Sequence, residues 1–210
     1  MSAREEILAA VRAATASAPD VAPVDRGYRR TAGLAREDVL DLFVERVADY
    51  RATVVQCRED ALERAVRDQM ADAIGPVVLP PHSPVDLHDL QHANDPATLV
   101  DDPDAPLSAA DLDEAYAVVT AARLGIAETG TIVLDHDDRQ GRRALTLVPD
   151  RHICIVRADQ VVASVPEAIA ELDPIRPQTW ISGPSATSDI ELDRVEGVHG
   201  PRTLVVVIVR

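Results

Sequence analysis

The chain contains no lysine, because all 21 of its basic residues are arginine. This absence excludes a Schiff base to a carbonyl substrate or to pyridoxal phosphate, and it excludes the phosphate-binding lysine of a Walker-type loop. Cysteine is also scarce: Cys57 and Cys154 lie far apart and form no CxxC motif. This chain alone therefore cannot supply the cysteines of an iron–sulfur cluster or of an all-cysteine zinc site. We expect two buried thiols rather than a disulfide.

Aromatic residues make up only 2 % of the chain, which disfavours stacking platforms for single-stranded nucleic acid. The 36 acidic residues outnumber the basic ones and give a net charge of −15, which disfavours binding to nucleic acid or to anionic membranes. No apolar run reaches the ~18–20 residues of a membrane span. The segment Met1–Ile7 is charged and lacks the apolar stretch of a signal peptide. We therefore expect a cytoplasmic protein.

The length of 210 residues and the hydrophobic content of 46 % suit one α/β domain with a small N-terminal extension. Ser2 can cap a first helix, in which Ile7, Leu8 and Val11 recur at helical spacing. Residues 17–27, rich in Pro, Ala and Asp, indicate a linker. We assign residues 1–27 to a helical arm with its linker and residues 28–210 to the α/β domain. The arm either docks on this domain or on a partner, or it is a frayed terminus.

The hydrophobic pattern along residues 28–210 predicts alternating helices and strands. Helices are expected over 37–50, 58–74, 108–123, 164–172 and 185–194, and strands over 53–57, 76–79, near Leu99, and over 126–134, 144–148, 152–156, 179–182 and 203–209. The strands 126–134 and 144–148 are expected to pair as an antiparallel hairpin. Helix–strand alternation favours a parallel sheet. The fold class is therefore α/β, with a Rossmann-like, mixed but mostly parallel sheet flanked by helices.

Histidines gather in the irregular, proline-rich stretch 80–106. His88 and His92 stand four residues apart, a spacing that places both on one face of a helix, and His82 precedes them. Surface loops rich in Asp and Pro often carry such histidines without a metal. We therefore expect a solvated loop here and no metal site.

Residues 127–131 (AETGT) interrupt an otherwise apolar strand with polar groups. Glu128 is a candidate acid or base, and the hydroxyls of Thr129 and Thr131 together with the backbone N–H of Gly130 are candidate anion-binding groups. Glycine in a strand permits a bulge or a close backbone approach. The alternative is a structural bulge with satisfied threonine side chains. We favour the functional interpretation, because a carboxylate within a buried strand needs a partner.

A second motif, WISGPSATSDIE at 180–191, predicts a strand, a Gly-Pro-Ser loop and a helix. Free N–H groups at a helix start bind anions. Gly183 and Pro184 shape the loop, and Ser185 or Thr187 can cap the helix. In open α/β sheets such a loop marks the ligand crevice at the carboxyl ends of the strands. The alternative is ordinary N-capping.

A third motif, GVHGP at 197–201, precedes the last strand. Gly200 and Pro201 fix an unusual backbone around His199, which can act as acid, base or hydrogen-bond donor, or can be purely structural. We take Glu128, Asp189 and His199 as candidate catalytic residues. The substrate-binding candidates are Thr129, Gly130, Thr131, Gly183, Pro184, Ser185, Thr187 and Gly200.

Taken together, the runs GIAETGTIVL, LTLVPDRHICIV, ISGPSATSDIE and GVHGP resemble the lactate utilization protein C family of the LUD domain type over about residues 112–209. The resemblance implies a fold like that of ribose-5-phosphate isomerases, glucosamine-phosphate deaminases and CoA transferases. It implies a part in the oxidation of L-lactate to pyruvate. It also implies partner proteins that carry iron–sulfur clusters, with no cofactor in this chain, and a crevice for a small carboxylate.

One departure from the family pattern concerns anion binding. The family often has GPSRTADIE where this chain has Ala186 in place of the arginine. A bidentate clamp from that position is therefore absent here, and Arg142, Arg143 or Arg202 is the candidate substitute. Two alternative functions stay open. One is a free-standing isomerase- or transferase-like enzyme for a phosphorylated or CoA-linked anion, and the other is a non-catalytic assembly subunit.

Overall fold

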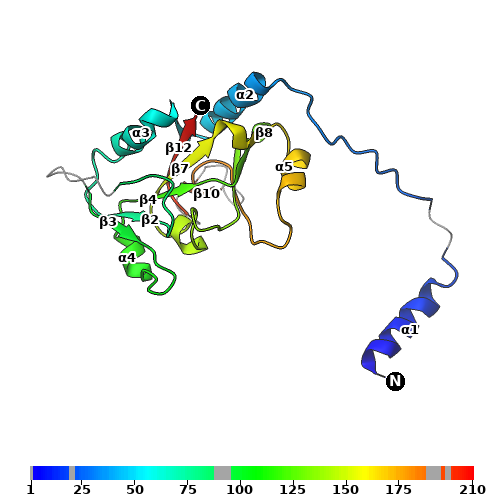
Figure 1. Ribbon diagram of the computed structural model, residues 1–210. Coiled ribbons are helices and arrows are strands. Elements are labelled where there is room, and N and C mark those ends of the chain that lie inside the picture. Colours follow the sequence, from blue (N-terminus) through cyan, green and yellow to red (C-terminus); the bar gives the residue numbers. More distant parts are fainter. Residues whose placement is uncertain (1, 19–21, 88–95, 188–194, 197–199) are drawn as a thin grey trace.

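The computed structural model describes residues 2–18, 22–87, 96–187, 195–196 and 200–210, and it contains a main parallel sheet (Figure 1). In spatial order this sheet consists of β1 (Thr53–Cys57), β12 (Thr203–Val209), β7 (Arg151–Arg157), β4 (Ala117–Ala121), β2 (Val77–Leu79) and β3 (Thr98–Val100). All neighbouring strands in it run parallel. The α/β class with a mostly parallel sheet is thus confirmed.

A second sheet is mixed. Its spatial order is β8 (Val161–Val162), β5 (Leu124–Ile126), β6 (Thr131–Leu134) and β9 (Thr179–Ile181). β5 pairs parallel with β8, whereas β6 pairs antiparallel with both β5 and β9. The short strands β10 (Ala186–Thr187) and β11 (Val195–Glu196) form a separate antiparallel pair.

The remaining regular elements are helices. The α-helices are α1 (Ala3–Thr15), α2 (Arg36–Asp49), α3 (Leu62–Asp68), α4 (Ala109–Asp113) and α5 (Val165–Glu171), and the 3₁₀ helices are η1 (Glu59–Ala61), η2 (Arg143–Thr146) and η3 (Ala158–Gln160). In the described ranges, no helix combines the length and the apolar character needed to cross a bilayer.

The neighbouring inner strands β12 and β7 are buried on both faces, as their Val- and Ile-rich sequences predict. Successive side chains point to opposite faces of a sheet. Cys154 and Val206 accordingly pack with α2, whereas Ile153 and Val205 pack with α3. Cys154 and the half-buried Cys57 are both free thiols, as expected.

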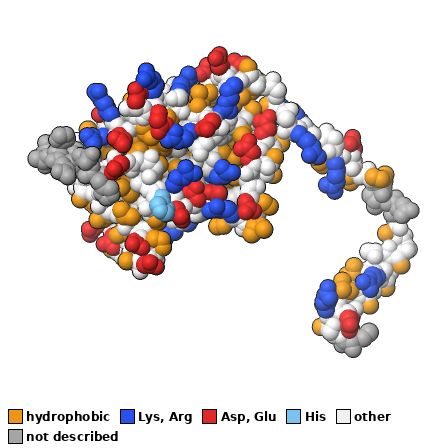
Figure 2. Space-filling view, viewed as in Figure 1, with side chains coloured by type: hydrophobic (Ala, Val, Ile, Leu, Met, Phe, Trp, Pro, Cys, Tyr) orange, Lys and Arg blue, Asp and Glu red, His pale blue; other side chains and the backbone are white. Residues whose placement is uncertain are grey.

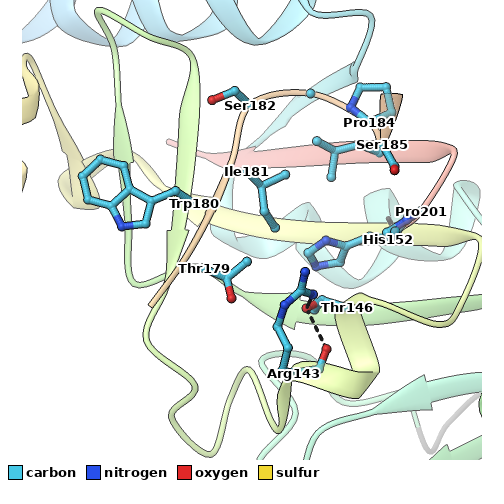
Figure 3. A pocket seen from close by; sticks show the side chains of 13 residues that line it. Arg143, Thr146, His152, Thr179, Trp180, Ile181, Ser182, Pro184, Ser185 and Pro201 are labelled. Carbon is cyan, nitrogen blue, oxygen red and sulfur yellow. Dashed lines mark hydrogen bonds between the residues drawn. The ribbon is translucent and has the colours of Figure 1, made fainter. Parts of the chain in front are cut away.

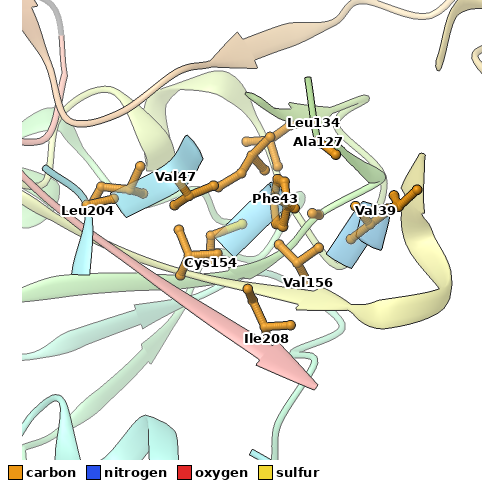
Figure 4. Close-up of a cluster of buried hydrophobic side chains, with 14 of the residues drawn as sticks. Val39, Phe43, Val47, Ala127, Leu134, Cys154, Val156, Leu204 and Ile208 are labelled. Carbon is orange, nitrogen blue, oxygen red and sulfur yellow. The ribbon is translucent and has the colours of Figure 1, made fainter. Parts of the chain in front are cut away.

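Helix α2 joins the two sheets into one core. Its Phe43 is fully buried among residues of both sheets, including Leu134 of β6 and Val156 of β7 (Figure 4). Arg36 at its first turn donates a hydrogen bond to the carbonyl oxygen of Val161 at 2.6 Å. The helix is therefore fixed both by packing and by its N-terminal contact.

Three glycines let the second sheet and the following loop approach α2 closely. A Cβ on Gly125 would lie 2.8 Å from the Phe43 ring, and one on Gly183 would lie 2.7 Å from Cβ of Tyr50. A Cβ on Gly130 would lie 2.7 Å from the backbone of Arg46. Residues 43, 46 and 50 follow one another by three and four positions, the spacing of a single helix face.

The arm at the N-terminus has the predicted helix and cap. Ser2 and Glu5 form a capping box at the start of α1, and no residue of α1 is buried. Figures 1 and 2 show α1 apart from the sheets, and the extended residues 22–35 follow it in the chain. Its apolar side chains Ile7 and Val11 are more than half exposed.

The predicted helix over 108–123 is wrong beyond its first turns. Ser108 caps α4 as expected, with its hydroxyl accepting a hydrogen bond from the N–H of Asp111 at 3.2 Å. The helix ends at Asp113, and residues 117–121 form β4, whose residues are all buried. β4 lies between β2 and β7. Burial on both faces favours the β-branched pair Val118–Val119 in a strand, and this tertiary environment overrides the local helical pattern.

Four other predicted elements differ from the structure. The helix predicted over 58–74 consists of η1 and the shorter α3, which ends at Asp68. Residues 144–148 form no strand, because Arg143–Thr146 is the 3₁₀ helix η2, and β6 pairs instead with β5 and β9. The predicted strand 126–134 is split by a turn at residues 127–130. The predicted helix 185–194 is wrong at Ala186–Thr187, which form β10, and residues 188–194 lie outside the described ranges.

We predict that Gly130→Ala lowers the free energy of unfolding by about 2 kcal/mol or more. Gly130 has a left-handed φ of +57°, which costs a residue with a Cβ about 1–2 kcal/mol, and the Cβ would also overlap the backbone of α2. Gly33 is the matched control, since its φ is +68° and nothing lies within 4 Å of a Cβ there. Urea unfolding of both variants separates strain from overlap, and an equal loss in both would contradict the close approach to α2.

Candidate functional site

A cavity of about 260 Å³ lies between the second sheet and the start of the last strand. Its wall consists of Arg143, Thr146, His152, Thr179, Trp180, Ile181, Ser182, Gly183, Pro184, Ser185, Gly200, Pro201 and Leu204 (Figure 3). His152 and Leu204 are the second residues of β7 and β12. The cavity therefore lies at the amino ends of these parallel strands and not at the carboxyl ends, where we expected it. The reason is that its loop follows β9, a strand of the second sheet.

Four of the predicted binding residues meet in this wall: Gly183, Pro184, Ser185 and Gly200. The N–H of Ser185 donates a hydrogen bond to the carbonyl oxygen of Pro201 at 2.8 Å, which fastens the Gly-Pro-Ser loop to the segment before β12. That N–H is engaged within the protein, so an anion in the cavity needs other donors.

The predicted residues Thr129, Gly130 and Thr131 lie behind the wall. The Oγ1 atoms of Thr129 and Thr131 are 2.7 Å apart, and Thr131 Oγ1 is 2.8 Å from Oγ of Ser182, which lines the cavity. Thr131 is only 4 % exposed. The N–H of Gly130 donates to the carbonyl oxygen of Ala127 at 3.3 Å. These hydroxyls thus support the cavity through Ser182 and do not line it.

Glu128 lies on the turn between β5 and β6 and not inside a buried strand. Its side chain is 45 % exposed and pairs with Arg29 at 2.8 Å. Glu128 is not part of the cavity wall, so a ligand in the cavity would not contact it. Its role as an acid or base stays a prediction.

Several predicted residues cannot be placed. Asp189 and His199 lie outside the described residues, and only the backbone of Thr187 is described, in β10. His88 and His92 also lie outside. His82 lies 3.4 Å from a carboxylate oxygen of Asp138, and no group of three metal-ligating side chains occurs in the described ranges.

Arg143 is the candidate cation of the cavity. Of the three arginines considered as substitutes, Arg142 is bound by Asp101 in bidentate fashion, with Nε 2.8 Å and Nη2 2.9 Å from its carboxylate oxygens. Arg202 is held in the same way by Asp150, at 2.7 Å for both contacts. Arg143 instead donates to the hydroxyl of Thr146 at 3.1 Å. No carboxylate in the described part of the chain pairs with it.

The cavity is electrostatically suited to an anion. Among its described wall residues Arg143 is the one with a permanent charge, and no carboxylate is present. Partial desolvation lowers the pKa of Arg143, but a guanidinium remains charged in proteins. An adjoining cavity of about 750 Å³ shares Arg143 and Thr179, but three aspartates line it. The smaller cavity is therefore the better place for a negative charge.

His152 forms part of the floor of the cavity. It is 1 % exposed, and its Nε2 lies 2.8 Å from Oγ1 of Thr120. Burial, assisted by the positive charge of Arg143, lowers the pKa of His152 to about 4. The ring is consequently neutral at neutral pH. Figure 3 shows it beside the guanidinium of Arg143.

Sequence reasoning missed His152, Thr146, Thr179 and Trp180 as cavity residues. His152 lies in an apolar strand and gives no signal of its own, because its role depends on its position at the edge of the sheet. Arg143 was one of three arginines considered as the anion-binding residue. The structure distinguishes it because each of the other two is held by an aspartate.

Comparisons with known proteins agree with this architecture. Residues 108–209 match the model of the LUD domain. Lactate utilization protein C of Deinococcus radiodurans is 44 % identical over 99 % of this chain and 95 % of its own length. Lactate utilization protein C of Bacillus velezensis is 26 % identical over 83 % of this chain and 79 % of its own.

A solved structure is also similar. The crystal structure of a DUF162 family protein from Deinococcus radiodurans superposes with a TM-score of 0.68 at 40 % sequence identity. The match covers 84 % of this chain and 99 % of that one.

We predict that His152 makes the fold sensitive to acid. Its pKa of about 4 in the folded protein lies below the ordinary value of 6.5, so the unfolded chain binds the proton more strongly. Stability from this group is complete above pH 6.5 and is lost as the pH falls towards 4, by about 3 kcal/mol. Urea unfolding at pH 7 and pH 4 should show that His152→Leu loses less stability than the wild type. An identical pH dependence would contradict the prediction.

Proposed function

We propose that this chain, which belongs to the lactate utilization protein C family of LUD domain proteins, serves lactate utilization by binding a small carboxylate in the cavity beside Arg143. Its relatives carry the name lactate utilization protein C, which supports the general role. The binding of a carboxylate is carried by one observation: the guanidinium of Arg143 reaches a cavity whose described wall residues include no acidic side chain.

The chemistry of arginine supports this ligand class. A guanidinium presents paired N–H donors that match the two oxygens of a carboxylate, and such charged hydrogen bonds are stronger than neutral ones. The desolvation of Arg143 strengthens the attraction, because fewer water molecules screen it. Ser182 and Ser185 add hydroxyls to the wall for the rest of a small polar molecule.

The size of the cavity favours lactate or pyruvate over larger anions. Sites for drug-sized ligands measure about 300–1,000 Å³, and this cavity lies below that range at about 260 Å³. A sugar phosphate or a CoA thioester would have to extend into the adjoining cavity, where Asp137 and Asp138 oppose a polyanion and Arg142 is already held by Asp101. The isomerase- or transferase-like alternative is therefore less well supported.

Oxidation of L-lactate to pyruvate releases two electrons and two protons, so an electron acceptor is required. We propose that partner proteins with iron–sulfur clusters accept the electrons in the cytoplasm. The arm formed by residues 1–27 is a candidate contact with such partners, because α1 exposes Ile7, Leu8 and Val11 and buries none of its residues. An assembly role without chemistry in this chain is the alternative.

We predict that Arg143→Gln weakens L-lactate binding by about 10- to 150-fold, because hydrogen bonds to a charged group contribute about 1.5–3 kcal/mol. Isothermal titration calorimetry measures the affinity for L-lactate directly. Arg202→Gln is the control, since it removes the same charge next to the cavity from a guanidinium already held by Asp150. Equal lactate affinity in Arg143→Gln and wild type would refute the site.

Deleting residues 1–27 tests the arm. Because α1 buries no residue, the truncated chain should keep the thermal midpoint and the lactate affinity of the full chain. Purified iron–sulfur partner proteins should be retained by the full chain and lost by the truncated one in a pull-down. Retention by both chains would show that the arm is not the contact. Failure of the full chain to retain them would remove the partner proposal.

A further inference from the structure

We propose that His152 recognises the oxygen on carbon 2 of the bound acid, and that it accepts both a 2-hydroxy acid and a 2-oxo acid because its partner Thr120 lets either ring nitrogen carry the proton. This inference rests on the proposed function, in which Arg143 holds the carboxylate. It adds the class of acid and the group that distinguishes that class from a simple carboxylate.

One nitrogen of His152 is open to a ligand. Nε2 is bound to Thr120, whereas Nδ1 has no hydrogen bond with any residue in the described ranges. The fully buried polar side-chain atoms without a partner are Nε of Arg67 and Oγ of Ser164, so Nδ1 of His152 is not fully enclosed. Because His152 is 1 % exposed and lines the cavity, its open nitrogen faces that cavity.

The position of His152 relative to Arg143 suits such an acid. In a 2-hydroxy acid the carboxylate and the hydroxyl sit on adjacent carbons, so the groups that bind them must lie side by side. The guanidinium of Arg143 lies next to the His152 ring, and its charge acts on that ring (Figure 3). A carboxylate on Arg143 therefore places its second carbon near the imidazole.

Thr120 can serve as donor or acceptor, because a hydroxyl does both. When its O–H points to Nε2, the ring proton sits on Nδ1 and is donated to the carbonyl oxygen of a 2-oxo acid. When Nε2 carries the proton and donates it to Thr120, the O–H of Thr120 turns towards Sγ of Cys154, 3.9 Å away. Nδ1 then accepts a hydrogen bond from the hydroxyl of a 2-hydroxy acid. The imidazole stays neutral in both arrangements.

His136 shows what a different partner does. Its Nδ1 lies 3.1 Å from the carbonyl oxygen of Gly141, which can only accept, so the proton must sit on Nδ1. In the neutral ring its Nε2, 2.9 Å from the hydroxyl of Thr179, is then an acceptor. The tautomer of His136 is thus fixed, whereas that of His152 can follow the ligand.

None of the described groups that contact the His152 ring or act on its charge favours its protonation. Thr120 and Cys154 are uncharged neighbours, and the pKa of the Cys154 thiol is raised to about 12, so no thiolate forms there. Arg143 is the charged group that acts on the ring, and its positive charge opposes protonation. A protonated ring would have two donors and could not accept from a hydroxyl.

The test compares three acids with the same carbon skeleton: L-lactate, pyruvate and propionate, which lacks the oxygen on carbon 2. Isothermal titration calorimetry gives the affinity of the full chain for each. We expect wild type to bind lactate and pyruvate about 3- to 10-fold more tightly than propionate, the usual contribution of one neutral hydrogen bond. His152→Leu should bind all three acids alike, with the propionate affinity of wild type.

Thr120→Val is a second, nearly isosteric variant. A buried N–H without an acceptor costs more than a bare ring nitrogen, so we expect the proton to stay on Nδ1. The preference for pyruvate over propionate should persist, and the preference for lactate should fall. A purely structural role for Thr120 would change all three affinities together.

The outcomes separate the two proposals. If wild type binds none of the three acids, the carboxylate site itself is refuted, and this inference with it. If wild type binds all three equally, or if His152→Leu retains the preference, recognition by His152 is refuted while the Arg143 site stands. If His152→Leu does not fold, the wild-type comparison and Thr120→Val decide the matter, since equal losses for lactate and pyruvate in that variant overturn the tautomer exchange.

Discussion

The two sheets are joined through the close packing of one face of α2 and the adjacent Tyr50 against three glycines. Phe43, Arg46 and Tyr50 lie over Gly125, Gly130 and Gly183, where a Cβ would approach atoms to within 2.7–2.8 Å. Interiors are packed so tightly that such contacts leave no room for an added methyl group. The second sheet can therefore reach the main sheet only because these positions carry no side chain. Two of the glycines belong to motifs that otherwise suggest anion binding.

This packing also creates the cavity. With Gly183 against Tyr50, the loop after β9 comes to the amino ends of β7 and β12, and its Ser185 bonds to Pro201. The cavity wall then combines a loop from the second sheet with His152 from the main sheet and Arg143 from η2. Its electrostatics follow from ion pairing: Asp101 and Asp150 neutralise the neighbouring arginines, which leaves Arg143 as the cation among the wall residues that the structure describes.

Local sequence signals succeed where an element depends on its own residues. The caps at Ser2 and Ser108, the helix with Pro166 in its first turn and the strand over residues 203–209 all appear as predicted. Local sequence signals fail where packing against residues distant in the chain determines the secondary structure. Residues 117–121 fit a helix by spacing but form the strand between β2 and β7, because burial on both faces outweighs local preference. The carboxylate of Glu128, expected in a buried strand, lies on the turn between β5 and β6, where it pairs with Arg29.

The sequence by itself determined the α/β class, the acidic surface without lysine, the absence of cysteine motifs and the family. It also predicted four residues of the cavity wall: Gly183, Pro184, Ser185 and Gly200. Only the tertiary structure decided which arginine faces the cavity and that a histidine in an apolar strand joins it. Those two facts depend on partners more than 30 positions away along the chain, Asp101, Asp150 and Thr120. Local patterns carry no information about charge pairing and desolvation at such separations.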